Sequence, residues 1–119
     1  MGETAGNSLE RMLGLLDLFS MDKPVWSTEA MMQATGSTRS TCYRYLKVLQ
    51  AAGFLTPVAQ GAYILGPRII ELDRQLRLRD PIYMAGGPPM KQLASRTGHS
   101  TLLCMLYSDT VMCVREEIS

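Results

Sequence analysis

The sequence lacks an apolar run long enough to cross a membrane. Its first apolar segment, residues 9–19, is interrupted by three charged side chains. The chain also lacks a basic start followed by an apolar stretch, which is the pattern of a secretory signal. These absences predict a cytoplasmic chain with no membrane partner.

Cysteine is scarce, and its number is odd. Cys42, Cys104 and Cys113 do not form the even framework of a small secreted domain, so we expect reduced thiols. Cys104 and Cys113 would lie opposite each other if residues 108–109 form a two-residue turn, and His99 precedes them. A metal or redox site is indicated only weakly, because structural zinc usually takes four ligands and free cysteine is commonly a buried apolar residue. We therefore expect no cofactor and no metal.

Catalytic motifs are also absent from the sequence. His99 is its only histidine, and neither the nucleophile-elbow spacing nor the phosphate-loop spacing occurs. The residue pattern therefore offers no recognisable set of nucleophile, base and orienting group, and we expect a protein that is not an enzyme.

Charge is nearly balanced over the whole chain but not along it. The formal net charge is +1, yet all acidic residues lie outside residues 30–70. That segment carries Arg39, Arg44, Lys47 and Arg68 without a carboxylate. A polyanion responds to the local field within a Debye length of about 8 to 10 Å. The segment is therefore expected to attract a polyanion.

The composition, 46% apolar and 19% charged, is typical of a folded chain, and helices can be predicted in its first half. Over residues 9–19, apolar residues recur at three- and four-residue spacing after a cap at Asn7 or Ser8. The proline at position 24 follows this helix and prevents its continuation. A short connection at residues 25–26 is expected next.

Two further helices follow this connection. Ser27 is expected to cap a helix over residues 28–34. Ser37 or Thr38 is expected to cap a third helix that runs to about Ala52. The second helix is short and the third is longer, with a tight turn between them.

The third helix has two distinct faces. One face, at i, i+3, i+4 and i+7, is predicted to pack inward and comprises Cys42, Tyr45, Leu46 and Leu49. A second face at the same spacing is polar, basic and aromatic and comprises Ser40, Tyr43, Arg44 and Lys47. The first face predicts a buried core, and the second predicts an exposed contact surface.

The rest of the chain is predicted to contain a hairpin and a second, smaller region. Strands are expected at residues 54–56 and 62–65, joined by a loop at 57–61. The C-terminal part is expected to contain a linker helix at 67–80, a helical stretch from residue 82 to about 98 with a kink at 86–89, and strands at 99–107 and 110–116.

This order predicts a winged helix-turn-helix fold, mainly α with a small β-wing. The major groove of DNA, about 12 Å wide, admits a helix, so exposed residues at the start of the third helix are expected to meet base edges. The N-terminus of the second helix and Lys47 are expected to hold phosphates, and Gln60 lies on the wing. The predicted DNA-binding residues are Ser27, Thr28, Thr38, Arg39, Ser40, Thr41, Tyr43, Arg44, Lys47 and Gln60.

Several separate motifs, in the right order, resemble the IclR family of bacterial regulators. These are SLER (8–11), LLDLF (15–19), ATG (34–36), STCYRYL (40–46), GFL (53–55) and YILGPR (63–68). The resemblance covers about residues 8–78. Ser37-Thr38 departs from it, because the family has a Leu-Pro-type entry to the recognition helix at this place.

The resemblance implies a domain organisation and a set of partners. It implies a winged helix-turn-helix domain at residues 1–66, a linker helix at 67–80, and the beginning of an effector-binding α/β domain at 81–119, which is incomplete here. Family members bind double-stranded DNA as homodimers or dimers of dimers and respond to a small-molecule effector. A nucleoid-associated regulator that reads a palindromic operator is therefore expected, with an effector only where the whole C-terminal domain exists.

A second interpretation of the same residues is a winged-helix module that associates with proteins without specific DNA readout. In that case the basic face of the third helix would serve an acidic partner or RNA. Sequence-dependent preference for duplex DNA distinguishes the two interpretations.

Overall fold

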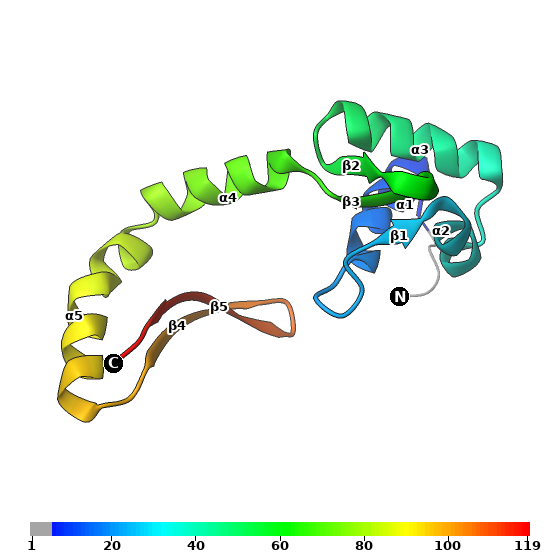
Figure 1. Cartoon of the computed structure of the whole chain (residues 1–119). Coiled ribbons are helices and arrows are strands. Elements are labelled where there is room, and N and C mark those ends of the chain that lie inside the picture. The colour runs from blue at the N-terminus through cyan, green and yellow to red at the C-terminus, as the bar shows by residue number, and fades with distance from the viewer. Residues whose placement is uncertain (1–5) are drawn as a thin grey trace. The chain divides into compact units, whose positions relative to one another are not determined.

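The computed structural model describes residues 6–119 (Figure 1). Its elements, in chain order, are α1 (Ser8–Gly14), η1 (Leu15–Leu18), β1 (Trp26–Ser27), α2 (Thr28–Thr35), α3 (Arg39–Ala51), β2 (Leu55–Val58), η2 (Ala59–Gly61), β3 (Ala62–Leu65), α4 (Pro67–Arg79), α5 (Pro81–Thr97), β4 (Thr101–Tyr107) and β5 (Thr110–Glu117). The chain forms two compact units, one through Leu72 and one from Asp73 onward. The change between them falls within α4.

The first helix begins at a reciprocal cap. The Asn7 side chain accepts a hydrogen bond from the backbone N–H of Glu10 at 2.9 Å, and the Glu10 carboxylate accepts one from the Asn7 N–H at 2.9 Å. Together the two bonds satisfy donors that a helix N-terminus otherwise leaves unpaired. The single helix expected over residues 9–19 is instead α1 followed by the 3-10 turn η1. This tighter turn places Leu15 in the core.

Side-chain caps also set the starts of α2 and α3. The hydroxyl of Ser27 accepts from the backbone N–H of Ala30 at 3.1 Å, as expected for the second helix. Of the two expected caps for the third helix, Thr38 takes the role, and its hydroxyl accepts from the Thr41 N–H at 3.3 Å. Between the helices, Gly36 has a φ of 74°, a left-handed conformation that glycine adopts without steric cost.

The wing is a three-stranded sheet in the order β1, β3, β2. The expected hairpin of β2 and β3 is present, but β2 extends through Pro57 and Val58, which were expected in the loop. Pro57 fits there because β2 is an edge strand, where a missing N–H leaves no ladder bond unmade. The strand β1 was expected only as a connection. It pairs antiparallel with β3 through Trp26↔Tyr63.

A single hydrophobic core holds the N-terminal unit together. Its buried side chains come from η1, both helices of the helix-turn-helix and the wing: Leu15, Met31, Cys42, Tyr45, Leu46, Leu49 and Leu55. The inward face predicted for α3 supplies four of these seven residues. Packing of this face against α2, η1 and β2 therefore fixes which side of α3 remains exposed.

The C-terminal unit contains α5 and the hairpin of β4 and β5. Asp80 caps α5 by accepting from the Ile82 N–H at 3.0 Å, and the helix continues through residues 86–89, where a kink was expected. The hairpin turns at Ser108-Asp109, as the sequence predicts, with Tyr107 paired to Thr110. Within residues 6–119, no helix combines the length and apolar character needed to cross a bilayer.

Candidate nucleic-acid interface

The exposed face of α3 forms the centre of the candidate interface. Ser40, Tyr43, Arg44 and Lys47 are all exposed, whereas the opposite face of the helix is buried in the core. The two-faced pattern predicted for this helix is thus confirmed. Tyr43 remains 46% exposed, so its ring is available for contacts outside the domain.

A polar hollow lies at the entrance to α3. It has a volume of about 260 Å³ and is lined by Arg11, Thr35, Gly36, Ser37, Thr38 and Thr41. Within it, the Thr35 hydroxyl lies 3.0 Å from the Ser37 hydroxyl and donates to the Met31 carbonyl at 2.8 Å. Hydroxyl groups, the Arg11 guanidinium and a helix N-terminus are all donors suited to a phosphate oxygen.

Arg39, the first residue of α3, is held by a carboxylate from α2. Its guanidinium donates to Glu29 at 3.0 Å, and both side chains are more than half exposed. The hydrogen bond from Arg39 holds the pKa of Glu29 below its ordinary value. The pKa of Arg39 is raised, mainly by the same bond and further by Tyr43. The pair orients a guanidinium fork at the beginning of the exposed face.

This ion pair changes the expected charge distribution. In sequence, residues 30–70 contain no acid, but folding brings the Glu29 carboxylate from just outside that segment against its first arginine. Arg68 is likewise paired, with Glu71 at 2.5 Å. Within residues 6–119, Arg44 and Lys47 form no ion pair. Among the four cations of residues 30–70, these two therefore present unneutralised charge.

Thr28 lies in a different place from the one expected for a phosphate contact. It is only 1% exposed, and its hydroxyl donates to the Gly61 carbonyl at 3.4 Å. Burial beneath the wing removes it from the surface, so its contact joins α2 to the turn at the tip of the wing. Ser27 is half-buried, and its hydroxyl is occupied as the α2 cap.

Gln60 lies at the tip of the wing and is exposed. Its φ of 64° is left-handed, as is that of the following Gly61 at 68°. A non-glycine residue in this conformation is uncommon and marks a tight turn. Of the predicted site residues, Arg39 contacts Glu29, and Thr38 lies beside Thr41 in the polar hollow. Gln60 and Lys47 take part in neither of these contacts.

Two residues at the interface were not among the sequence-based predictions. Glu29 binds Arg39, and Arg11 of α1 joins the hollow at the start of α3. Their charge was visible in the sequence, but their proximity to α3 depends on how the helices pack. Within the residues that the structure describes, no group of three or more His, Cys, Asp or Glu side chains is placed to hold a metal ion.

The element order and the basic, exposed face of α3 define the class: a winged helix-turn-helix DNA-binding domain. Residues 8–59 match the family model of the IclR helix-turn-helix domain. The chain is similar to the HTH-type transcriptional regulator KipR of Bacillus subtilis, with 26% identity over 87% of this chain and 41% of that protein.

Solved structures agree with this match. A crystal structure from Silicibacter sp. TM1040, assigned to the IclR transcriptional regulators, has a TM-score of 0.81 at 25% identity and covers 94% of this chain and 44% of its own. The Thermotoga maritima IclR structure shares the fold, with a TM-score of 0.74 at 20% identity over 94% of this chain and 45% of its own. Residues 8–59 therefore carry a helix-turn-helix domain of the IclR type, and the chain as a whole is similar to regulators of that family. It spans less than half the length of these relatives.

Proposed function

We propose that this chain binds duplex DNA sequence-specifically, with α3 in the major groove. The observation that carries the proposal is the exposed face of α3, where the unpaired cations Arg44 and Lys47 follow an oriented Arg39. A helix inserted by its N-terminal end brings its first exposed side chains to base edges. The later ones then reach the phosphates.

Arg39 is the proposed base-reading residue. A guanidinium presents its donors in a planar fork, which matches the two acceptors of guanine in the major groove. Glu29 holds that fork in one direction before DNA arrives, at an N–O distance of 3.0 Å. Pre-orientation lowers the entropy lost when a long side chain is ordered on binding. Ser40, Tyr43 and Arg44 are proposed as neighbouring contacts to bases or phosphates.

The residues proposed to contact phosphates lie around Arg39 and its neighbours on α3. Lys47 lies about a turn beyond Arg44 and is assigned to the backbone, as are the hydroxyls of Thr38 and Thr41 in the polar hollow. Ser27 contributes through the N-terminal end of α2, and Gln60 through the wing. Thr28 is left out of this set because it is buried.

We also propose that the protein acts as a dimer on a palindromic operator. Exposed apolar side chains on α1 and α4 support this assembly, among them Leu9 at 66%, Ile70 at 70% and Leu76 at 72%. Two-fold pairing of subunits would match two half-sites. Sedimentation showing a monomer at micromolar concentration would contradict the dimer. The protein is proposed to work in the cytoplasm, without catalysis, and to bind an effector where a complete C-terminal domain is present.

The test is selection of bound duplexes from a random DNA library at a stated salt concentration, followed by titration of the winner against scrambled DNA. An enriched palindrome with a specificity ratio of about a thousandfold or more supports specific readout. Weak, salt-sensitive binding without enrichment would contradict it. That result would favour association with an acidic protein partner instead.

A further inference from the structure

Cys104 and Cys113 occupy directly opposed positions on β4 and β5. Both are free and exposed, whereas Cys42 is buried in the N-terminal core with 0% exposure. Free cysteine is usually a small buried apolar residue, and only Cys42 fits that description. Cys104 and Cys113 instead lie exposed, side by side, on the hairpin.

The strand register places the two thiols within reach of each other. Opposed residues of an antiparallel pair have Cα atoms about 4.5 or 5.5 Å apart, depending on the kind of pair. A disulfide spans Cα separations of about 4.4 to 6.8 Å, so either kind of pair admits the bond. Opposed side chains also project from the same face of a hairpin. The register therefore places both cysteines opposite each other on one face of the hairpin.

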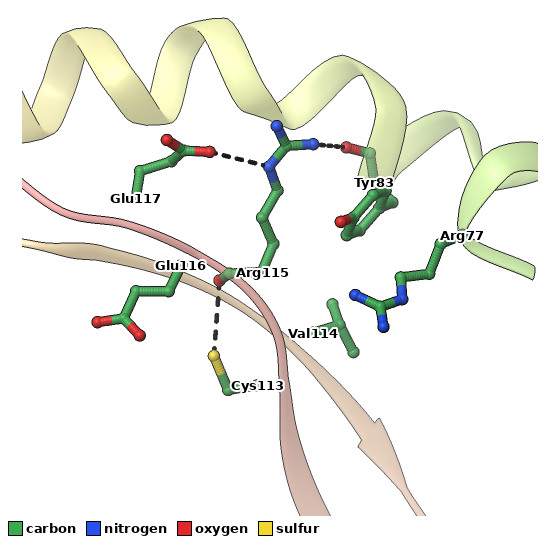
Figure 2. Close-up of a pocket in the computed structure, with 7 residues that line it drawn as sticks. All are labelled: Arg77, Tyr83, Cys113, Val114, Arg115, Glu116 and Glu117. Atoms are coloured by element: carbon green, nitrogen blue, oxygen red, sulfur yellow. Dashed lines mark hydrogen bonds and ion pairs between the residues drawn. The ribbon is translucent and has the colours of Figure 1, made fainter. Parts of the chain in front are cut away.

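A β-bulge directs both thiols away from α5. The register shifts between Leu103, which pairs with Arg115, and Cys104, which pairs with Cys113. Figure 2 shows the result: Arg115 points to α5, where its guanidinium donates to the Tyr83 carbonyl at 2.9 Å, while Cys113 points the other way. Without the extra residue, positions 113 and 115 would share a face. The bulge thus leaves the thiols accessible on the open face of the hairpin.

The Cys113 thiol makes no short hydrogen bond that would hold it in a structural role. Its thiol donates only a long hydrogen bond, 3.5 Å, to the Arg115 carbonyl of its own strand. The neighbouring positions on the open face, Leu102 and Leu106, are 58% and 74% exposed. A small reagent can therefore approach either sulfur.

We propose that Cys104 and Cys113 form a dithiol modification site that closes to an intrachain disulfide on reaction with a small-molecule disulfide such as oxidised glutathione. One protein thiolate attacks a sulfur of the reagent, forming a mixed disulfide and releasing one glutathione thiolate. The second protein thiolate then displaces the remaining glutathione and forms the Cys104–Cys113 bond. The protein loses two electrons and two protons, and one glutathione disulfide becomes two thiols.

The first experiment treats the whole chain with oxidised glutathione, alkylates the remaining thiols and digests with trypsin. Residues 97–115 form one tryptic peptide that contains both cysteines and no internal cleavage site. We expect this peptide to be lighter by two hydrogen atoms and to resist alkylation, while Cys42 is the internal control and is alkylated on unfolding. A stable product with two glutathione adducts on residues 97–115 would overturn the proposal.

The variants Cys104→Ser and Cys113→Ser sharpen the test. Each is expected to retain a single glutathione on the remaining thiol, because the displacement step has lost its nucleophile. A second probe, phenylarsine oxide, bridges two neighbouring thiols without any oxidation. We expect the parent chain to retain one equivalent against a monothiol competitor and each variant to lose it. Equal retention by the parent and both variants would show that the two sulfurs do not act as a pair.

Discussion

The two compact units of this chain bury their apolar side chains to very different extents. The N-terminal unit encloses Leu15, Met31, Leu46, Leu49 and Leu55, each at 2% exposure or less. In the C-terminal unit, α5 and the hairpin bury one apolar side chain, Ala94, at this level within the described residues. Large apolar side chains on β4 and β5 remain exposed instead.

This difference in burial means that a hydrophobic core stabilises the N-terminal unit much more than the C-terminal unit. The N-terminal unit has a core that contacts several helices and strands, so its contact face is carried by a rigid scaffold. Within the described residues, the hairpin of β4 and β5 packs mainly on α5, and a two-stranded hairpin is marginally stable by itself. DNA recognition is therefore assigned to the unit that can hold side chains in place.

The largest expected loss of stability comes from a substitution in the core of the N-terminal unit. Leu46→Ala removes a side chain of 1% exposure and leaves a cavity. It should lower the free energy of unfolding by about 2 to 5 kcal/mol. Denaturant unfolding followed at Trp26, which packs against this core, measures the change. A loss below about 1 kcal/mol would mean that the core is looser than its burial indicates.

A second contrast lies within the N-terminal unit, between the start and the middle of α3. Arg39→Ala should reduce discrimination between the selected operator and a base-substituted one by about 1 to 3 kcal/mol. Lys47→Ala is the matched control, which should weaken all duplexes alike and lower the salt slope by about 1. Titrations at several salt concentrations measure both effects. The role assignment fails if both variants affect random and cognate DNA equally.

The cap of the same helix has a smaller expected effect. Thr38→Ala removes the hydroxyl that accepts from the Thr41 N–H and should lower the free energy of unfolding by about 1 kcal/mol. Thr38→Ser keeps an accepting hydroxyl and is the control. Thermal unfolding of the two variants separates the cap from the loss of a methyl group. An equal loss in both would show that the hydroxyl does not carry the effect.

The smallest change in stability is expected from a substitution on the hairpin of the C-terminal unit. Leu106 is 74% exposed on β4, so Leu106→Thr should change the free energy of unfolding by no more than about 0.5 kcal/mol. Threonine also keeps a strand-forming, β-branched side chain. The same denaturant titration used for Leu46→Ala measures it. A loss comparable with that of a core residue would show that this face is covered in solution and would abolish the contrast between the units.

Local signals allowed much of this structure to be predicted. Caps by Asn7, Ser27 and Thr38 act within three residues of themselves, so they are readable from a short stretch of sequence. The two faces of α3 follow from helical periodicity alone. The IclR resemblance carried by motifs between residues 8 and 68 agrees with the family match over residues 8–59.

Two of the predictions that differed from the structure involve distant pairings. The strand β1 is two residues long and exists because Trp26 pairs with Tyr63, a partner far along the chain. Thr28 was placed on the surface because it begins a helix, yet the turn at Gly61 covers it. Local propensity has no information about either contact.

The sequence by itself determined the approximate helix positions, the buried and exposed faces of α3, the presence of two hairpins and the resemblance to the IclR family. These features depend on periodicity, capping chemistry and motif order, all of which act over a few residues. Only the tertiary structure decided that Glu29 holds Arg39, that Thr28 is buried and that a bulge turns Cys104 and Cys113 to an open face. Each of these depends on side chains brought together by packing and strand register, which the spacing of residues along the chain does not specify.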